Sequence, residues 1–270
     1  MKQDDRRDDR DDRGKEQAVK REKGQAVEIG GFQKLTLLDY PDQMACIVFT
    51  DGCNFRCPFC QNSGLVTGRN AATGAAETEV SRMNAAVAEE DVLKYLQKRR
   101  GLLDGVVLSG GEPLLQAGLT DFIREIRKLG YLVKLDTNGS FPGRLQALLS
   151  EGLLDYVAMD IKSGPDSYAA AAGIEADLSP EIGRSIALLQ EGKIPFEFRT
   201  TLVKGIHRLD DVRKISAWIA GGQPYYLQSY SDEGDILSPR GLSAFSEEET
   251  EAFLSAARER CPNARLRKRL

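Results

Sequence analysis

The chain has 270 residues and a formal net charge of −4 at pH 7, with 41% hydrophobic and 29% charged residues. This length and composition allow a sizeable core in one large domain or two small ones. They give no electrostatic case for nucleic-acid binding, and no apolar run approaches the roughly 20 residues that would cross a membrane.

The first 24 residues repeat Asp-Asp-Arg and contain almost no apolar side chain. Such a segment cannot bury enough surface to offset chain entropy, so we expect residues 1–24 to be a disordered, solvated tail. An interaction arm is the alternative. Residues 25–270 are expected to form the folded domain.

The cellular compartment is indicated by the N-terminus and by the cysteines. The chain is charged from its second residue, unlike a secretory signal. Three of its five cysteines cluster within eight positions, which suits a reducing cytoplasm better than a disulfide framework. We therefore expect a cytoplasmic protein.

From about residue 30, short runs rich in aliphatic, β-branched or aromatic residues end in polar or glycine residues, which is typical of strands. The expected strands are residues 44–50, 105–111, 131–139, 155–162, 195–203 and 224–230.

Helices are predicted between the strands by apolar residues at helical spacing. These residues are Phe122, Ile126 and Leu129; Ile182, Ile186 and Leu189; and Val212, Ile215 and Ile219. Ser179 and Pro180 are expected to cap the second helix and open its first turn. Ser246 and Glu249 predict a capping box before a last helix. The small, polar residues 63–87 predict a flexible loop.

Six strand-then-helix units predict an α/β protein with a parallel sheet and outer helices. The sheet can be an open doubly wound sheet or a partial (β/α)6 barrel. In both architectures ligands gather at the carboxyl ends of the strands. The polar strand ends are therefore expected to converge on one rim.

Three cysteines occur in the sequence CNFRCPFCQN, with the spacing C-x-x-x-C-x-x-C at Cys53, Cys57 and Cys60. Zinc, an iron–sulfur cluster and a turn without metal are the alternatives. A closed zinc site needs four ligands, usually with a second pair downstream. No such pair follows, which leaves zinc poorly supported.

The remaining sulfur and imidazole side chains give no fourth ligand. Cys46 lies in an apolar strand and is expected to be a buried core thiol. Cys261 lies in a charged stretch and is expected to be a free surface thiol. The single histidine, His207, is expected to be a loop residue.

A [4Fe–4S] cluster held by three cysteines leaves one iron open for a substrate or cofactor. Pro58 would stiffen the segment. Phe55 and Phe59 would shield the cluster from water, and Arg56 would offset part of its negative charge.

The sequence CNFRCPFC resembles the signature of the radical S-adenosylmethionine enzymes. The resemblance implies that the open iron is chelated by the amino and carboxylate groups of S-adenosylmethionine. It also implies that an electron from the cluster cleaves the cofactor to methionine and a 5′-deoxyadenosyl radical, which abstracts a hydrogen atom. The fold it implies is the partial (β/α)6 barrel.

Further strand ends extend the likeness: Ser109-Gly110-Gly111-Glu112-Pro113, Asp136-Thr137-Asn138-Gly139 and Asp160-Ile161-Lys162. Two glycines would let the backbone approach a ligand, and the glutamate would face its ammonium group. The alternatives are an ordinary turn for the second motif and a surface ion pair for the third.

The cofactor contacts that we infer, most of them from this resemblance, are Phe59, Gln61, Gly110, Gly111, Glu112, Asp136, Asn138, Asp160, Lys162 and Arg199. Arg199 would pair with the cofactor carboxylate, or form an ion pair at the core edge. Gln228 and Tyr230 would touch the adenine, although the histidine that pyruvate formate-lyase activases carry in this region is missing here.

Residues 30–62 are similar to the activating proteins of anaerobic ribonucleoside-triphosphate reductase. The resemblance implies that this chain makes a glycyl radical on a partner enzyme, and that reductase is the expected partner. The chain lacks eight further cysteines for two more cubanes, so a flavodoxin- or ferredoxin-type donor would supply electrons. The alternatives are a radical enzyme acting on a small molecule or peptide, and a non-catalytic metal-binding protein.

Overall fold

The computed structural model describes residues 26–66 and 87–267. Within them, eight strands form one sheet whose order follows the chain from β1 to β8. Strands β1 and β2 are antiparallel, and every later pair of neighbours is parallel. The strands are β1 (Ile29–Thr36), β2 (Ala45–Thr50), β3 (Gly105–Gly110), β4 (Leu132–Thr137), β5 (Tyr156–Asp160), β6 (Phe196–Leu202), β7 (Tyr225–Ser229) and β8 (Ala264–Arg267).

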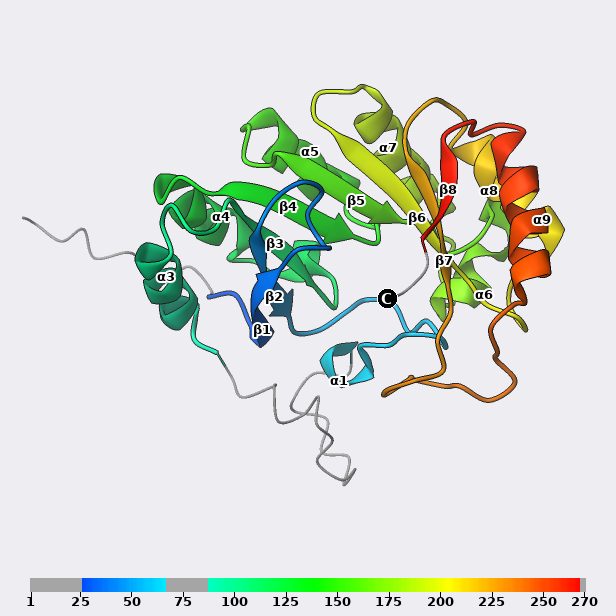
Figure 1. Ribbon diagram of the computed structural model, residues 1–270, viewed down its shortest axis with the longest axis horizontal. Coiled ribbons are helices and arrows are strands. Elements are labelled where there is room, and N and C mark those ends of the chain that lie inside the picture. The colour runs from blue at the N-terminus through cyan, green and yellow to red at the C-terminus, as the bar shows by residue number, and fades with distance from the viewer. Residues whose placement is uncertain (1–25, 67–86, 268–270) are drawn as a thin grey trace, which may run out of the picture.

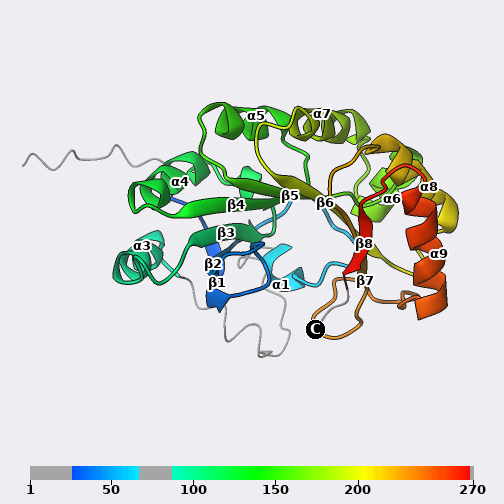
Figure 2. The ribbon, with the colours of Figure 1, turned by 45° about the horizontal axis from the view of Figure 1, so that its top comes forward.

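Helices connect the parallel strands. They are α1 (Ser63–Val66), α3 (Glu89–Lys98), α4 (Leu119–Lys128), α5 (Pro142–Ser150), α6 (Tyr168–Ala172), α7 (Ser179–Gln190), α8 (Leu209–Trp218) and α9 (Glu247–Arg258), with short 3₁₀ turns at Pro113–Leu115 and Pro165–Ser167. Helices α4, α5 and α7 lie on the convex side of the curved sheet (Figures 1 and 2).

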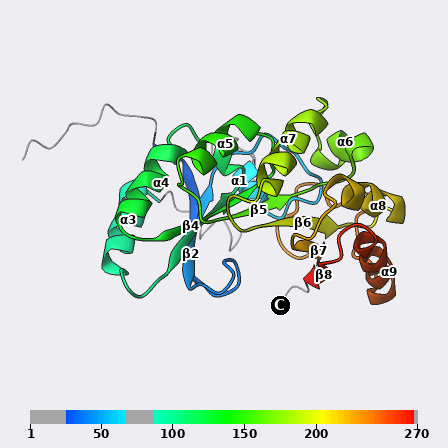
Figure 3. The ribbon, with the colours of Figure 1, turned by 90° about the horizontal axis from the view of Figure 1, so that it is seen from above.

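Residues 51–62, here called the cysteine segment, run with α1 across the concave side of the sheet (Figure 2). Strands β1 and β8 lie at opposite ends of the sheet and do not pair with each other (Figure 3). The fold is therefore a partial barrel, and the six expected parallel strands are confirmed as β2 to β7 with ends one or two residues shorter.

The apolar residues at helical spacing in α4 form the face of the helix that packs into the core, which is why they predicted the helix. In α4, Leu119, Phe122, Ile123 and Ile126 are fully buried against the sheet. Burying each such side chain stabilises the fold by about 1.5–3 kcal/mol. The predicted capping box of α9 is confirmed, since the Glu249 amide donates to Ser246 Oγ at 3.1 Å and the Ser246 amide to the Glu249 carboxylate at 2.8 Å.

The predicted cap of α7 was wrong. Ser179 is already the first helical residue, and the residue before the helix is Leu178. The Asp177 side chain accepts the Ser179 amide at 2.9 Å, which satisfies one of the first-turn amides that have no partner inside the helix. Pro180 does lie in the first turn.

Strand β8 was not predicted, because ARLR is too polar for the usual strand pattern. Its polar residue Arg267 forms an ion pair with the buried Glu197. The carboxylate accepts hydrogen bonds from two guanidinium nitrogens at 3.0 and 3.1 Å. The guanidinium also lies 3.8 Å from the ring centroid of Tyr226. Partner side chains on β6 and β7 therefore hold this strand at the sheet edge.

Two cysteines outside the cluster motif are both buried. Cys46 is fully buried in β2, as expected. Cys261 is also fully buried, so the prediction of a surface thiol was wrong. Helix α9 packs against α8, which brings the Cys261 sulfur within 3.5 Å of the Ser216 carbonyl oxygen.

Part of the predictions lies outside the described residues. The expected tail 1–24 is wholly outside them, and so are residues 67–86 of the loop predicted at 63–87. Its first four residues form α1, so the loop prediction was wrong there. In the described part of the chain, no helix is both long enough and apolar enough to cross a membrane.

Candidate active site at the carboxyl ends of the strands

The cysteine segment is fixed by backbone hydrogen bonds to distant parts of the chain. The Arg56 amide donates to the Ala172 carbonyl at the end of α6 at 2.9 Å. A Cβ on Gly173, whose φ is +64°, would lie 2.1 Å from the Arg56 carbonyl oxygen, so this contact requires glycine. From the other side, the Leu237 amide donates to the Cys60 carbonyl at 3.1 Å.

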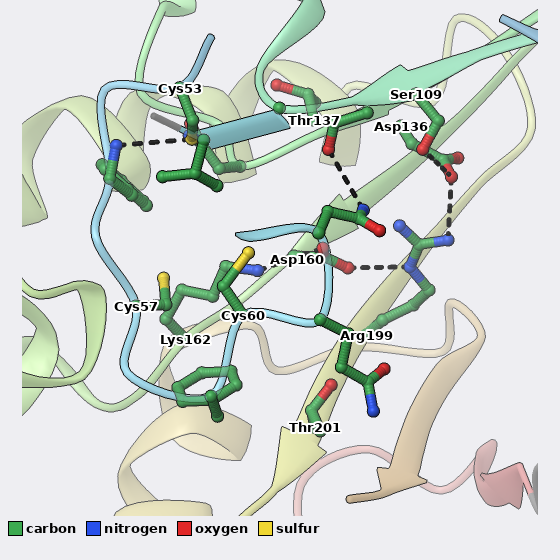
Figure 4. A pocket seen from close by; sticks show the side chains of 18 of the residues that line it. Cys53, Cys57, Cys60, Ser109, Asp136, Thr137, Asp160, Lys162, Arg199 and Thr201 are labelled. Atoms are coloured by element: carbon green, nitrogen blue, oxygen red, sulfur yellow. Dashed lines mark hydrogen bonds and ion pairs between the residues drawn. The ribbon is translucent and has the colours of Figure 1, made fainter. Parts of the chain in front are cut away.

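The three thiols of the segment line one pocket of about 300 Å³ (Figure 4). Burial raises the pKa of Cys53 to about 11 and that of Cys57 to about 12, although the Lys162 ammonium acts to lower both. Burial also raises the pKa of Cys60. Because the thiolate is the form that binds metal, metal binding here must displace protons.

The arrangement of three thiols around one pocket fits a cluster better than a closed zinc site. Among the described residues, no three His, Cys, Asp or Glu side chains are close enough to hold one metal ion. A zinc ion with bonds of about 2.3 Å would need its sulfurs within about 4 Å of one another. In a cubane each thiolate binds a different iron, so three thiols around one pocket fit a [4Fe–4S] cluster.

Glu112 lies behind the pocket wall and is fully buried. Its carboxylate accepts the amides of Leu114 and Asn138, at 3.0 and 2.7 Å, and the Thr137 hydroxyl at 2.8 Å. Burial outweighs these hydrogen bonds and raises the pKa of Glu112 to about 7. The side chain thus fixes the end of β4, and the structure does not place it in contact with the pocket.

The two glycines before Glu112 are required by the neighbouring strand. A Cβ on Gly110, whose φ is +113°, would lie 2.4 Å from the Thr50 nitrogen. A Cβ on Gly111 would lie 1.9 Å from the Gly52 carbonyl oxygen. Both glycines also line the pocket, so the close approach of β3 to the cysteine segment leaves their backbone exposed to a ligand.

Asn138 joins the end of β4 to the cysteine segment. Its side-chain amide donates to Asn54 Oδ1 at 3.0 Å and lies 3.9 Å from the Cys53 sulfur. The Asn54 amide in turn donates to Ser140 Oγ at 2.9 Å. Through the contact of Asn138 with Glu112, the buried carboxylate positions the first cysteine.

Arg199 joins two aspartates at the floor of the pocket (Figure 4). Its guanidinium donates to Asp160 at 2.8 Å and to Asp136 at 3.3 Å. Lys162 pairs with Asp160 at 3.1 Å, and Lys134 pairs with Asp136. Burial would raise the pKa of both aspartates, but the arginine and lysine charges outweigh it and lower the pKa of both.

Of the other residues with an expected cofactor contact, all but Tyr230 lie around the same pocket. Phe59, Gln61 and Gln228 line it, and the Gln61 amide donates to the Ser231 carbonyl at 3.0 Å. Tyr230 does not line it; its buried hydroxyl has no hydrogen-bond partner in the described structure. All ten side chains or backbones expected to contact the cofactor therefore line the pocket except Glu112.

His207 is a buried positioning group that the sequence analysis left as an ordinary loop residue. It does lie in a loop, but its Nδ1 accepts the Val203 amide at 3.0 Å and its Nε2 donates to the Lys162 carbonyl at 2.8 Å. Burial lowers its pKa, which keeps this tautomer neutral. Its ring also meets Phe59 edge-on at 6.2 Å. The sequence did offer one signal for this role, because His207 follows shortly after the expected strand at residues 195–203.

A cysteine-lined pocket at the carboxyl ends of a partial α/β barrel defines a class of cofactor-dependent enzymes. Residues 47–219 match the family model of the radical SAM superfamily, and the chain belongs to that superfamily. Its members use a [4Fe–4S] cluster with three cysteine ligands and S-adenosylmethionine.

Similar sequences differ in the reaction that their names describe. A Methanocaldococcus jannaschii protein, named as a candidate glycyl-radical enzyme activating enzyme, is 28% identical over 75% of this chain and 79% of its own length. A 7-carboxy-7-deazaguanine synthase from Methanopyrus kandleri is 31% identical over 71% of this chain and 77% of its own length. A pyruvate formate-lyase-activating enzyme from Clostridium pasteurianum is 30% identical over 54% of this chain and 57% of its own length.

Solved structures share the fold. QueE from Escherichia coli has a TM-score of 0.52 at 13% identity, covering 90% of this chain and 94% of its own. Streptococcus suis SuiB bound to S-adenosylmethionine has a TM-score of 0.57 at 12% identity, covering 81% of this chain and 48% of its own. These likenesses support the partial (β/α) barrel.

Proposed function

We propose that this chain is a glycyl-radical enzyme activase whose cluster is held by Cys53, Cys57 and Cys60. The observation that carries the proposal is the single pocket that joins these thiols to the polar ends of β3, β4, β5 and β6. When bound, the cluster would supply the electron for reductive cleavage of S-adenosylmethionine, and the radical so formed would take a hydrogen atom from a glycine of the partner.

The pocket residues have separate tasks in this proposal. Gly110 and Gly111 line the pocket, and their backbone would accept the cofactor's ammonium group. Lys162 and Arg199 give the floor positive charge for a carboxylate, while Asp136 and Asp160 keep both cations fixed. Phe59 excludes water beside the third cysteine, and Gln228 offers an amide to the adenine.

The size of the pocket supports a macromolecular substrate. Its volume of about 300 Å³ is at the lower end of the range for a site that holds one small ligand. Once the cofactor is bound, little space remains among the described residues for a second small molecule. A glycine on a protein loop can instead reach the radical from outside.

The expected partner is anaerobic ribonucleoside-triphosphate reductase, because residues 30–62 resemble the activators of that enzyme. The described pocket contains one set of three cysteines, so the proposal includes an external flavodoxin- or ferredoxin-type donor. A reduced cluster of this kind would work in a reducing cytoplasm.

The test is electron paramagnetic resonance after anaerobic reconstitution with iron and sulfide. The reduced protein, S-adenosylmethionine and the reductase should together give a glycyl-radical doublet. The Cys57→Ala variant, handled identically, should give none. Cofactor cleavage without a doublet for any glycyl radical enzyme would reject the activase and retain the superfamily chemistry.

A second function is a radical enzyme acting on a small molecule. The synthase relative supports it, and so does a neighbouring pocket of about 180 Å³ that shares Gln61 and Asn62 with the first. Phe32, Phe49 and Leu65 contribute apolar lining to that pocket. Product analysis with small-molecule candidates such as 7-deazaguanine precursors would distinguish this function, because no partner protein would be needed.

A further inference from the structure

A second pocket adjoins the pocket of the three thiols, on the side of β1 and β2. Its volume is about 180 Å³. Gln61 and Asn62 line both pockets and so form the wall between them. Phe32 of β1, Phe49 of β2 and Leu65 of α1 line the second pocket but not the first. The second pocket is called the flanking pocket here.

Two hydrogen bonds hold the wall between the pockets in place. The Gln61 side-chain amide donates to the Ser231 carbonyl, in the loop after β7, at 3.0 Å. The Asn62 side-chain amide donates to the Gly110 carbonyl, at the end of β3, at 3.4 Å. The wall is therefore tied to two distant parts of the chain, so the fold itself sets the shape of the flanking pocket.

The surface inside the flanking pocket is mostly apolar. Phe49 is partly exposed, Leu65 is buried, and the ring of Phe32 meets Tyr95 of α3 edge-on with centroids 5.1 Å apart. The polar residues that also line the pocket are Gln33, Gln61, Asn62, Ser63 and Asp235.

The volume of the flanking pocket fits one large side chain. An apolar cavity of about 150 Å³ holds a molecule the size of benzene. Sites that enclose a whole small-molecule ligand are larger, at about 300–1,000 Å³. A leucine or phenylalanine side chain therefore fits the flanking pocket better than a separate substrate does.

The partner's glycine gives an activase little to recognise, because glycine has no side chain. Selection of one glycine must then depend on the residues beside it in the partner's loop. Neighbouring Cα atoms lie about 3.8 Å apart, so a side chain next to the glycine can enter a pocket that shares a wall with the first. Burial of such a side chain contributes about 1.5–3 kcal/mol.

We propose that the flanking pocket binds a large apolar side chain next to the partner's radical-bearing glycine and thereby selects that glycine. The inference rests on the proposed function and deepens it, because it states which class of neighbouring residue the site recognises. Phe49 and Leu65 are then residues that determine specificity. A small molecule in the flanking pocket is the alternative that the experiment separates.

The test uses variants of the proposed reductase partner with the full-length, reconstituted chain. The two residues beside the radical glycine are changed singly to leucine, phenylalanine, alanine and aspartate, and the glycyl-radical signal gives kcat/KM for each. At one of the two positions, the wild-type chain should prefer leucine or phenylalanine over alanine by about tenfold or more. Aspartate should be the poorest, because its charge would be buried without a partner.

Two substitutions of Phe49 should change this preference in different ways. In Phe49→Ala the apolar contact is lost, so kcat/KM should fall about tenfold for the leucine and phenylalanine forms and change little for the alanine form. In Phe49→Trp the larger ring takes up pocket volume, so the alanine form should become the best substrate. A general defect of the protein would instead lower kcat/KM for all forms equally.

Phe196→Ala is the matched control. Phe196 is also a partly exposed aromatic residue of the sheet, but it packs edge-on against Phe198 in β6 and lines neither pocket. Its preference among the reductase forms should equal that of the wild type. A preference that both Phe49 variants keep would overturn the proposal, and so would a change of equal size in Phe196→Ala.

The arm with the wild-type chain does not depend on the folding of any variant. Equal kcat/KM for all reductase forms, with a normal glycyl-radical doublet, would reject the flanking pocket and retain the activase. Cofactor cleavage without a doublet for any form would reject the activase and this inference with it. Turnover of a 7-deazaguanine precursor that is lost in Phe49→Trp would assign the pocket to a small molecule and would also overturn the proposal.

Discussion

Buried carboxylates lie at two places, called corners here, under opposite electrostatic conditions: Glu112 lies behind the pocket wall, while Asp136 and Asp160 line the pocket floor. At the corner of Glu112 only neutral amides and a hydroxyl donate, and burial raises the pKa to about 7. At the corner of Asp136 and Asp160, Arg199 and lysine side chains lower the pKa of both aspartates. The comparison indicates that the first corner builds the scaffold, while the second keeps its charges for a polar ligand.

The largest effect is expected at Cys57, which lines the same pocket as the two aspartates. The Cys57→Ala variant should lose S-adenosylmethionine cleavage entirely, because one iron would lack its thiolate. Iron content and cleavage products measure the effect. Cys261→Ala is the control, since that thiol is buried between α8 and α9. Cleavage that survives in Cys57→Ala would contradict the assignment of Cys57 as a cluster ligand, on which the roles given to both corners depend.

Arg199→Met should destabilise the protein by about 3–5 kcal/mol, because two aspartates would lose a buried cation. The paired aspartates stabilise the wild type above about pH 4, and this stabilisation is lost as the pH falls toward their lowered pKa values. The variant should therefore show a smaller stability change at acid pH. Urea unfolding measures both quantities.

Arg213→Met is the control for Arg199→Met. Arg213 is half exposed and lies 3.9 Å from Glu259, so its loss should cost less than about 1 kcal/mol. Equal losses in the two variants would contradict the difference between the charged floor and an ordinary surface pair.

The pH effect of Glu112 is opposite in sign to that of the aspartates, and Glu112→Gln should remove it. Because the pKa of Glu112 is raised to about 7 in the folded protein, wild-type stability falls from about pH 4.5 to pH 7, as the unfolded chain ionises at this position while the folded chain keeps its proton. The loss over this window is about 3 kcal/mol. The variant should lose this dependence, and urea unfolding from pH 4.5 to 8 measures it.

A second measurement on Glu112→Gln tests its direct role. Iron content should be unchanged, while cofactor binding should weaken only modestly, because the side chain acts through Asn138 and the β4 end. A binding loss as large as that of Lys162→Met would show direct contact and would contradict the scaffold role.

The smallest effect is expected for Ser109→Ala. The serine hydroxyl donates to Asp136 at 3.2 Å, and a hydrogen bond to a charged group contributes about 1.5–3 kcal/mol at most. Because Arg199 and Lys134 remain, we expect a loss near or below about 1 kcal/mol in urea unfolding. A loss as large as that of Arg199→Met would mean that the cations do not dominate this corner.

The sequence predicted the parallel strands and the convergence of their polar ends, because both follow from local periodicity and chain order. The thiol spacing likewise indicated a cluster. The direction of the Glu112 side chain could not be predicted from the sequence, because its three hydrogen-bond donors come from residues 114, 137 and 138. The glycine pair was noticed, but its requirement comes from Thr50 at the end of β2 and from Gly52 in the cysteine segment.

Other misses also trace to tertiary contacts. Cys261 looked exposed because its neighbours are charged, while the packing of α9 on α8 buries it. Strand β8 depends on Glu197, seventy residues earlier. His207 is defined by carbonyl and amide partners on the β5 and β6 ends.

The anchors of the cysteine segment bear on the order in which the enzyme matures. The segment leaves β2 early in the chain, yet its backbone is secured by Ala172, Leu237 and Ser238. During synthesis, the three cysteines are therefore made long before the residues that hold their backbone in place. Iron and sulfide are best delivered after the second half has folded, which makes cluster insertion a late step of biosynthesis.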